Sequence, residues 1–310
     1  MTTVVRVLAG GPDAERAVSI DSGRAIAEAL GASGRFAPEL SIIDRIDQGE
    51  LAELTGEIVF PALHGPYGEG GPLQRLLEAD GRPFVGSGSR AAKRAIDKVV
   101  TKSIAAHEGI PVLSTAILDP EDDGLPFALP IVVKPIFEGS TIGLHVCREQ
   151  HEWLATHRAA QVSRKPTMIE PFVEGRELTV GMIDRGSGLE CVPIIEIIPK
   201  HKLYDYEAKY AREDTQYVLD PDLPEGVAEI VTESTAKLAH ALGIRDVCRA
   251  DFMLDEVGRP FLLEINTMPG FTSHSLVPKA CAHIGISMSD LCAHLVERAM
   301  ARATTLEMHE

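Results

Sequence analysis

Residues 249–270 carry a group of side chains that could bind a hard metal ion. The group consists of two carboxylates, one amide and one guanidinium, namely Asp251, Glu264, Asn266 and Arg249. Carboxylate and amide oxygens are ligands that suit Mg²⁺, which usually completes its shell with water and substrate phosphates. These residue types therefore indicate a magnesium site. The alternative is a solvated strand face on which Arg249 and Glu264 form a surface ion pair.

Two strands are needed to position this group. Apolar segments flank a turn that contains Gly258, a pattern that predicts an antiparallel hairpin. We expect Leu254 to face Arg259 across the four-residue turn. Arg249 then faces Glu264, and alternation puts all four polar side chains on one face. A one-residue bulge would break this register. The second strand is otherwise strongly apolar, so its carboxylate and amide are expected to be mostly buried and to need partners.

The composition limits the classes of function. The chain has 310 residues, a mass of 33.5 kDa and 45% apolar residues, which suits two or three domains with real cores. The formal net charge of −16 argues against a nucleic-acid partner or an anionic membrane surface, because either needs a basic field. Any phosphate ligand must therefore be met by a local cluster of lysines and arginines.

The cysteines and the N-terminus indicate a cytoplasmic protein. Five cysteines are scattered without a CxxC pair, so we expect neither a zinc site nor a disulfide framework. They suit small core positions in a reducing compartment. The apolar run at residues 4–9 is too short for a signal peptide or a membrane span, and we expect no membrane insertion.

The N-terminal part of the chain contains two candidate site residues. A buried strand at 4–9 and a helix from about Ser19 predict the kind of edge at which α/β proteins bind ligands, although GxGxxG is absent and a dinucleotide site is not supported. Glu15 lies in the connecting loop, where it could hold a substrate ammonium or only favour the helix start. His64 ends a second buried strand beside the glycine-rich residues 65–71, and it is either a site residue or a hydrogen-bonded structural group.

The middle of the chain contains two segments that could contact a nucleotide, after a predicted helix at 89–107. Between strands at 131–134 and 144–147 lies EGST, residues 138–141, which could cover phosphates as a mobile lid or form a plain hairpin turn. The GK[ST] signature of a Walker loop is missing. Residues 167–177 run from a strand through a glycine turn, and could present backbone groups to an adenine edge or form a surface turn.

A further lid is suggested by residues 194–217. They mix basic and aromatic side chains with little periodicity, and long structureless loops in compact domains are usually functional. Helices are predicted at about 225–242 and 289–302, on either side of the hairpin.

Several motifs follow one another along nearly the whole chain. They are GGPDAERAVS at 10–19, HGPYGE at 64–69, Lys134 with EGST at 138–141, EGRELT at 174–179, YDYEAKY at 204–210, LEINTMPG at 263–270 and TSHS at 272–275. In this order they resemble the ATP-grasp superfamily and, within it, the D-alanine–D-alanine ligase family. Together they are far more specific than any one of them alone.

The resemblance implies an α/β, three-domain ATP-grasp fold. It comprises an N-terminal parallel-sheet domain at 1–93, a central domain with the phosphate lid at 94–184, and a C-terminal domain with the metal site at 185–310. ATP would lie between the second and third domains. The implied ATP-binding residues are Lys98, Lys134 and Lys209 at the phosphates, Thr141 in the lid, Glu170, Phe172 and Val173 near the adenine, and Glu177 at the ribose.

The resemblance also implies the reaction and its cofactors. The carboxylate of one D-alanine would attack the γ-phosphate of ATP, and the amine of a second D-alanine would displace phosphate from the acyl phosphate, giving D-alanyl-D-alanine for peptidoglycan synthesis. Asp251, Glu264 and Asn266 would hold Mg²⁺, with two ions expected and Mn²⁺ possible in their place. A monovalent cation such as K⁺ and a homodimer are further expectations.

The remaining implied roles concern the two amino acids. Glu15, helped by His64, would bind the ammonium group of the first D-alanine. Ser275 and Leu276 would take the carboxylate of the second. Roles at the reacting centre and in lid closure are implied for Arg249 and the Gly270 N–H, which would stabilise the oxyanion, and for Ser140, Tyr210 and Glu15, which would latch the lid.

Four positions depart from the family pattern: Ala17, Gly70, Arg75 and Phe137. The first three would affect loop rigidity, and Phe137, in the lid, would weaken phosphate contacts or closure. One alternative is a paralogous ligase that uses D-serine, D-lactate or another amino acid as second substrate, but relatives that use D-lactate lack Tyr210, so the dipeptide is favoured. The other is a non-catalytic nucleotide-binding relative, which should have lost Arg249 or a metal carboxylate.

Overall fold

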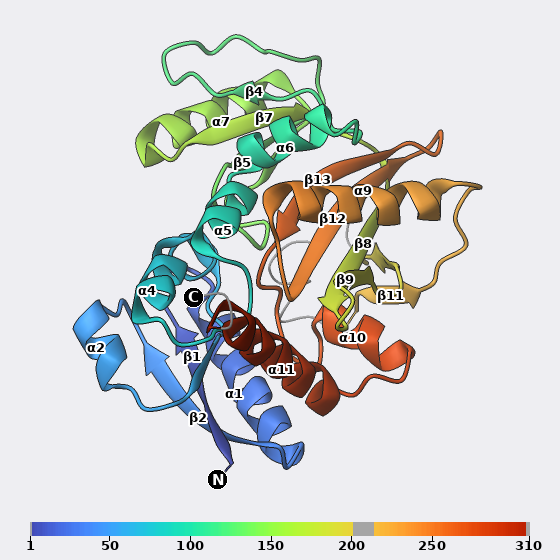
Figure 1. Ribbon diagram of the computed structural model, residues 1–310. Helices are drawn as coiled ribbons and strands as arrows, with labels where there is room; N and C mark the ends of the chain where they lie inside the picture. The colour runs from blue at the N-terminus through green and yellow to red at the C-terminus, as the bar shows by residue number, and fades with distance from the viewer. Residues whose placement is uncertain (1, 201–213, 308–310) are drawn as a thin grey trace.

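The first of three sheets is built from the N-terminal part of the chain. The computed structural model describes residues 2–200 and 214–307, and the three sheets lie within them (Figure 1). This sheet is parallel, with order β2-β1-β3, which confirms the predicted N-terminal parallel sheet. Its strands need crossover connections, which helices supply. The elements are β1 (Thr3–Gly10), α1 (Arg16–Ala32), β2 (Phe36–Ile43), α2 (Gln48–Glu53), β3 (Ile58–Pro61), α3 (Gly65–Gly68) and α4 (Pro72–Asp80).

The helix after β1 begins earlier than predicted. We expected it to start at Ser19, whereas α1 begins at Arg16. The Ser19 hydroxyl is buried, where it accepts a hydrogen bond from the Gly10 N–H at 2.8 Å and donates one to the Ala62 carbonyl at 2.7 Å. Ser19 therefore joins the ends of β1 and β3 instead of capping the helix.

The second sheet is antiparallel, with order β4-β7-β5-β6, and lies at the top of Figure 1. The predicted helix at 89–107 is divided at Asp97. The Asp97 carboxylate accepts hydrogen bonds from the Val99 and Val100 N–H groups, both at 3.0 Å, and so caps a second helix. The elements are α5 (Ser89–Ile96), α6 (Lys98–His107), β4 (Ala116–Ile117), β5 (Ile131–Pro135), β6 (His145–Cys147), α7 (Gln150–Ser163) and β7 (Thr167–Pro171).

The third sheet has the order β11-β10-β8-β12-β13 in the described chain, with β9 paired to β8. Residues 195–198, which we expected to belong to a structureless loop, form β10 and pair with both β8 and β11. The elements are β8 (Gly175–Asp184), β9 (Leu189–Cys191), β10 (Ile195–Ile198), β11 (Gln216–Leu219), α9 (Val227–Leu242), β12 (Val247–Asp255), β13 (Pro260–Asn266), α10 (Leu276–His283) and α11 (Met288–Glu307).

The predicted hairpin of β12 and β13 is present, but its register differs from the prediction. At the turn, Leu254 pairs with Pro260, one residue beyond the expected partner. A bulge beside Asp251 adds a second shift of one residue, so that Asp251 pairs with Glu264. The predicted pairing of Arg249 with Glu264 is therefore wrong.

The two shifts nevertheless leave the polar side chains on one face. Side chains alternate with period two, so a net displacement of two residues returns each of them to the predicted side of the hairpin. Arg249 lies opposite Asn266. Leu263 and Glu264 line the same cavity, because a bulge can turn two consecutive side chains to one side.

The first and third sheets share one apolar core. Phe60 of β3 packs edge-on against Phe271, with ring centroids 5.6 Å apart, in a cluster that also contains residues of β8 and α11. A buried polar link lies between the same parts: Asp246 accepts a hydrogen bond from the Gly86 N–H at 2.7 Å and one from Arg302 of α11 at 2.8 Å. The second sheet packs on a separate core around Trp153.

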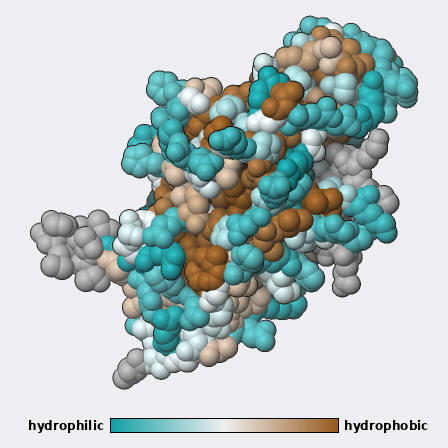
Figure 2. Space-filling view, turned by 90° about the vertical axis from the view of Figure 1, so that its right-hand side faces the viewer, coloured by the Kyte–Doolittle hydropathy of each residue, from teal (hydrophilic) through white to brown (hydrophobic). Residues whose placement is uncertain are grey.

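The cysteines are free thiols held mostly in the interior. Four of the five, at positions 147, 248, 281 and 292, are buried. Cys191 is half-buried, and burial raises its pKa to about 11. On the face shown in Figure 2, hydrophobic residues gather across the middle and hydrophilic residues dominate the margins. In the described residues, no helix combines the length and apolar character that a membrane span requires.

Candidate active site

Two adjoining cavities contain the predicted site residues. The larger cavity lies between the second sheet and the β12–β13 hairpin and holds about 940 Å³ of space, part of it open to solvent. It brings together all the described residues predicted to bind ATP and two of the predicted metal ligands. These are Lys98, Lys134, Thr141, Glu170, Phe172, Val173, Glu177, Asp251 and Glu264.

The smaller cavity, of about 650 Å³, lies beside the ends of the N-terminal strands. Its lining includes Glu15, His64, Ser140, Arg249, Asn266, Gly270, Ser275 and Leu276. Glu264 lines both cavities. A group bound in the larger cavity can therefore approach a group bound in the smaller one at this side chain.

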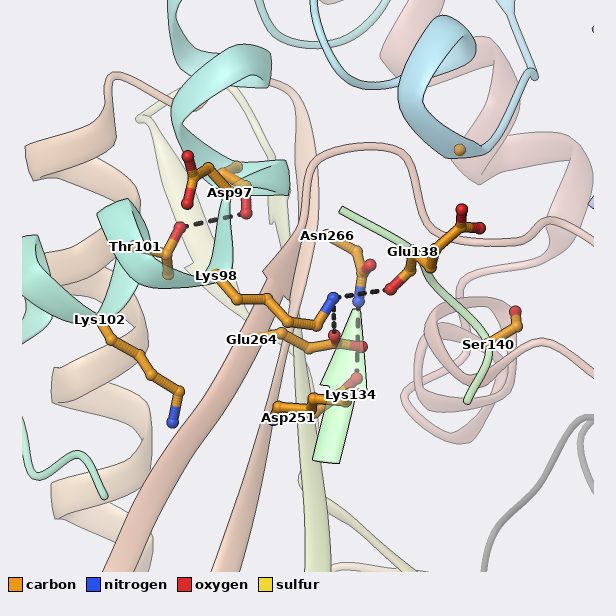
Figure 3. Close-up of polar contacts among 12 residues, drawn as sticks. Asp97, Lys98, Thr101, Lys102, Lys134, Glu138, Ser140, Asp251, Glu264 and Asn266 are labelled. Atoms are coloured by element: carbon orange, nitrogen blue, oxygen red, sulfur yellow. Dashed lines mark hydrogen bonds and ion pairs between the residues drawn. The ribbon is translucent and has the colours of Figure 1, made fainter. Parts of the chain in front are cut away.

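The oxygen-bearing side chains of the hairpin converge where the cavities meet (Figure 3). Asp251 and Glu264 are cross-strand partners, and Asn266 Nδ2 lies 3.5 Å from Asp251 Oδ2. The donor set is thus two carboxylates and one amide on a paired, rigid backbone. This set fits a hard cation such as Mg²⁺, whose protein ligands are oxygens.

Each of the two carboxylates is also paired with a cation. Arg249 Nε and Nη2 donate to the two oxygens of Asp251 at 2.8 and 2.7 Å, a bidentate geometry that fixes the guanidinium plane. Lys98 Nζ lies 3.1 Å from Glu264 Oε2. The Thr179 hydroxyl donates a third hydrogen bond to Asp251 at 2.6 Å. Neighbouring carboxylates repel each other, and these donors offset the repulsion.

A second charged cluster lies deeper in the larger cavity. Glu170, on β7, contacts Lys102 of α6 and lies 2.7 Å from Lys134 Nζ of β5. Burial alone would raise the pKa of Glu170, but Lys134 and Lys102 together outweigh it and hold the pKa below its usual range. Burial lowers the pKa of Lys102 to about 8, with Glu170 opposing the shift. At neutral pH Glu170 and Lys102 are therefore both ionised.

The EGST segment crosses from the larger cavity to the smaller one. The Ser140 hydroxyl donates a hydrogen bond to Glu15, which joins this segment to the N-terminal part of the chain. Lys98 Nζ donates to the Glu138 carbonyl oxygen at 2.7 Å, and Lys165 Nζ lies 2.7 Å from the Glu138 carboxylate. A Cβ at Gly139 would lie 2.8 Å from a Glu15 carboxylate oxygen, so glycine is needed for this close approach.

Two buried titratable groups line the smaller cavity. His64 Nδ1 lies 3.2 Å from the Met268 carbonyl oxygen, so Nδ1 carries the proton, and Nε2 has no hydrogen-bond partner among the described residues. Burial lowers the pKa of His64 and keeps the ring neutral. Burial, with a smaller contribution from Glu15, raises the pKa of Glu69 to about 8. The cavity therefore presents a neutral imidazole acceptor and a protonated carboxyl group.

Some residues of the site were not predicted, and some predictions lie outside the described residues. Glu69, Lys102 and Thr115 had no predicted role, although Lys102 follows Lys98 by one helical turn, a spacing that places both on one face. The other two carry no comparable signal. The predicted residues Lys209 and Tyr210, with the motif YDYEAKY, lie outside the described part of the chain.

One departure from the family pattern has a local reason. A Cβ at Gly70 would lie 2.3 Å from the Pro66 carbonyl oxygen, so the turn after α3 excludes any side chain. Phe137, immediately before the EGST segment, is half-buried, and nothing in the structure explains its replacement of a basic residue.

Comparisons with known proteins agree with this geometry. Residues 121–297 match the family model described as the D-ala D-ala ligase C-terminus. D-alanine–D-alanine ligase from Bordetella petrii is 39% identical over 302 residues, covering 96% of this chain and 92% of the relative. The enzyme of that name from Cupriavidus necator is 38% identical over 317 residues, covering 98% and 93%.

Solved structures give the same result. The D-alanine–D-alanine ligase from Bacillus anthracis complexed with ATP superposes with a TM-score of 0.82 at 28% identity, covering 98% of this chain and 99% of that one. The VanG D-Ala:D-Ser ligase from Enterococcus faecalis shares the fold with a TM-score of 0.80 at 22% identity, covering 96% and 100%. The predicted ATP-grasp fold is confirmed, and the chain belongs to the D-alanine–D-alanine ligase family.

Proposed function

We propose that this chain joins two D-alanine molecules to D-alanyl-D-alanine, with conversion of ATP to ADP and phosphate, for the synthesis of peptidoglycan precursors. The observation that carries the proposal is the junction of two cavities at Glu264, within a chain that matches D-alanine–D-alanine ligases over nearly its full length. One cavity suits a nucleotide and the other a small amino acid. The reaction requires the two to meet.

ATP would occupy the larger cavity. Lys98 and Lys134 supply positive charge for the phosphates in a chain that is acidic overall, and Lys209 would add to them. Glu170 and the Val173 backbone would face the adenine beside Phe172, and Glu177 would bind the ribose. Ser140 and Thr141 would cover the phosphates from the lid.

Asp251, Glu264 and Asn266 would hold Mg²⁺, with two ions proposed and Mn²⁺ as a substitute. When bound, the metal neutralises phosphate charge and so favours attack on the γ-phosphate. Arg249 and Lys98 now balance the two carboxylates, and a cation at the same oxygens would relieve them of that role. K⁺ as an activating ion is a separate proposal, tested by turnover in Na⁺ and K⁺ buffers.

The two D-alanine molecules would occupy the smaller cavity. Glu15 would bind the ammonium of the first, and the lone pair of His64 Nε2 would accept one of its hydrogen bonds. Ser275, with Leu276, would bind the carboxylate of the second, since Ser275 lies at the start of α10 where the helix dipole favours an anion.

The reaction would proceed in two steps at the junction. The carboxylate of the first D-alanine attacks the γ-phosphate, giving an acyl phosphate and ADP. The amine of the second D-alanine attacks the acyl carbon, and phosphate leaves. Arg249 and the Gly270 N–H would stabilise the oxyanion. Ser140, Glu15 and Tyr210 would hold the lid closed, which keeps water from the acyl phosphate.

The test is phosphate release with ATP and Mg²⁺ in the presence of D-alanine, with the product identified by mass. L-alanine, D-serine and D-lactate serve as alternative substrates. We expect turnover to require D-alanine and to yield the dipeptide. Turnover with only another acceptor would support the paralogous ligase instead, and absence of turnover with every acceptor would contradict both.

We further propose that the protein acts as a homodimer in the cytoplasm, where ATP is available. Sedimentation equilibrium would give twice the chain mass of 33.5 kDa for the dimer. The division into units 1–93, 94–184 and 185–310 also remains a proposal. The proposed bounds assign strand β8 (Gly175–Asp184) to the second unit, although it pairs within the third sheet. Limited proteolysis would test the bounds by showing whether the chain is cleaved near residues 94 and 185.

A further inference from the structure

Lys102 is a buried lysine for which the proposed mechanism has no use. Its side chain is only 4% exposed, and it projects from α6 one turn after Lys98. Lys98 reaches the Asp251–Glu264–Asn266 group, as Figure 3 shows, whereas Lys102 lies apart from that group. Burial of an ammonium group is costly without partners. The ammonium group of Lys102 must therefore have partners that offset this cost.

The partners of Lys102 come from both sides of the larger cavity. Its Nζ contacts Oε1 of Glu170, on β7, and donates to the Leu262 carbonyl oxygen, on β13, at 3.1 Å. Among the described residues, those that line the larger cavity include Lys134 and Glu170 but not Lys102. Lys102 thus acts on Glu170 from behind, out of reach of a bound nucleotide.

The surroundings of Glu170 consist of donors. Oε1 is contacted by Lys102 and accepts from the Thr115 hydroxyl at 3.0 Å, and Oε2 lies 2.7 Å from Lys134 Nζ. The charged groups around Glu170 are Lys102 on α6 and Lys134 on β5, and Glu264 on β13 acts on Lys102 from the other side. A carboxyl group in this setting is ionised and can only accept hydrogen bonds.

The two lysines differ in what ATP would demand of them. Lys134 lines the cavity and would be drawn to the phosphates, which weakens its hold on Glu170. Lys102 does not line the cavity and stays with Glu170 when the nucleotide is bound. The constant partner of the carboxylate is therefore Lys102.

We propose that Lys102 is a positioning residue that keeps Glu170 an acceptor-only carboxylate, and that this pair selects a nucleobase with a 6-amino group over one with a 6-carbonyl group. The amino group of adenine donates to a carboxylate, whereas a 6-carbonyl oxygen cannot pair with one. The inference rests on the proposed function in one respect, namely that the larger cavity is the nucleotide site.

Removing the charge of Lys102 has a defined chemical consequence. Glu170 is 1% exposed, and a buried carboxylate that loses its constant cation takes up a proton more readily. A protonated carboxyl group can donate as well as accept. The variant should therefore lose discrimination between the two bases, and should lose more of it as the pH falls.

The experiment measures calorimetric affinities for ATP and ITP with Mg²⁺ and without D-alanine. For the unaltered protein we expect tighter binding of ATP and a ratio of affinities that is flat between pH 6 and 7.5. For Lys102→Met we expect the ratio to fall by about tenfold at pH 7 and further at pH 6. If Lys102 acted through packing alone, Lys102→Met would lower the affinities for ATP and ITP equally, and their ratio would not depend on pH.

Three control variants separate charge from packing. Lys102→Arg keeps a cation and should therefore keep most of the preference for ATP over ITP. Thr115→Val removes a neutral donor from the same carboxylate oxygen and should change the ratio less than twofold. Lys237→Met removes a largely exposed lysine that pairs with Glu233 on α9, and should change nothing.

A double variant decides whether Lys102 acts through Glu170. Glu170→Gln should itself reduce the ratio, and Lys102→Met should reduce it no further in that background. An unchanged ratio in Lys102→Met, equal losses for both nucleotides, or an additive loss in the double variant would overturn the proposal. If Lys102→Met does not fold, the ratio of Glu170→Gln alone decides: no change there contradicts the inference.

These outcomes are distinguishable from failure of the proposed function. A protein that binds ATP but makes no dipeptide contradicts the ligase assignment, while the ATP to ITP ratio still tests Lys102. A protein that binds neither nucleotide contradicts the assignment of the larger cavity, on which the inference depends.

Discussion

At the scale of single residues, the site is held together by side chains that fix one another. Arg249 donates hydrogen bonds to both oxygens of Asp251. This bidentate contact fixes the orientation of the planar guanidinium group at the wall of the smaller cavity. A lysine at the same position would keep the charge and lose the bidentate geometry. Orientation of the charge, rather than its presence, is what the pair provides.

Loss of this bidentate geometry in Arg249→Lys should slow the reaction. We expect kcat for dipeptide formation to fall about 100-fold or more, as for loss of one preorganised oxyanion donor, with ATP affinity changed less than threefold. Steady-state kinetics and calorimetry measure the two effects. Arg259→Lys is the matched control, because Arg259 pairs with Asp255 at the far end of the same hairpin and is 69% exposed. A similar loss in both variants would contradict the role of Arg249.

Glu69 makes stability depend on pH in a predictable direction. With its pKa at about 8, the native state keeps a proton that the unfolded chain releases above about pH 4.5. The free energy of unfolding should therefore fall as pH rises from about 4.5 to 8, by on the order of 3 kcal/mol between pH 6 and 9, and Glu69→Gln should remove this dependence. Urea unfolding at pH 6 and 9 measures it. Glu28→Gln, at an exposed position, should give the same difference as the unaltered protein.

At the scale of elements, the proposed lid, residues 138–141, makes one close approach to the N-terminal part of the chain. Gly139 brings the backbone against the Glu15 carboxylate, and Ser140 hydrogen-bonds to that carboxylate. A methyl group at position 139 would meet only the end of a flexible side chain. The fold can accommodate it by moving Glu15, but this movement would disturb the proposed ammonium site.

Gly139→Ala should therefore affect substrate binding more than stability. We expect the KM for D-alanine to rise about tenfold, because the displaced carboxylate no longer meets the ammonium, while Tm changes by less than about 3 °C. Gly49→Ala is the control, since a Cβ there would approach no atom closer than 3.4 Å. A large drop in Tm with unchanged KM would show that the glycine serves the fold instead.

For the β12–β13 hairpin, local sequence patterns predicted some features and not others. Alternation and the turn glycine were sufficient to predict both strands and the common face of Asp251, Glu264 and Asn266. The pairing was not predictable, because the turn is one residue longer than expected and the bulge places an extra residue, Leu263, in β13, and the alternation of side chains records neither shift. The Lys102–Glu170 pair escaped prediction for a different reason: its partners are 68 residues apart in the chain (170 − 102).

At the scale of the whole molecule, the N-terminal and C-terminal parts are joined by a buried ion pair as well as by their shared core. Asp246 is fully buried between Gly86 and Arg302, and its left-handed φ of 67° suits Asp or Asn. Sequence motifs indicated the ATP-grasp fold and its N-terminal parallel sheet, but no motif marks this junction. The junction forms only in the folded protein, because Gly86, Asp246 and Arg302 are far apart in the sequence.

Asp246→Asn should expose the contribution of this junction. The amide keeps the backbone conformation and leaves Arg302 without its counter-charge, so we expect the free energy of unfolding to fall by about 3 kcal/mol. Asp21→Asn removes an exposed pair with Arg24 and should cost less than about 1 kcal/mol. Urea denaturation of both variants tests the difference, and equal effects would contradict the importance of burial.

The burial of the thiols makes this protein convenient for labelling. A thiol reacts as the thiolate, and buried groups or those with a raised pKa, such as Cys191, supply little of it near neutral pH. Cysteines introduced at two exposed positions, Val162→Cys on α7 and Val257→Cys at the hairpin turn, would then carry spin labels while the native residues stay unmodified. The distance between the labels would measure the separation of the second sheet from the hairpin, with and without ATP.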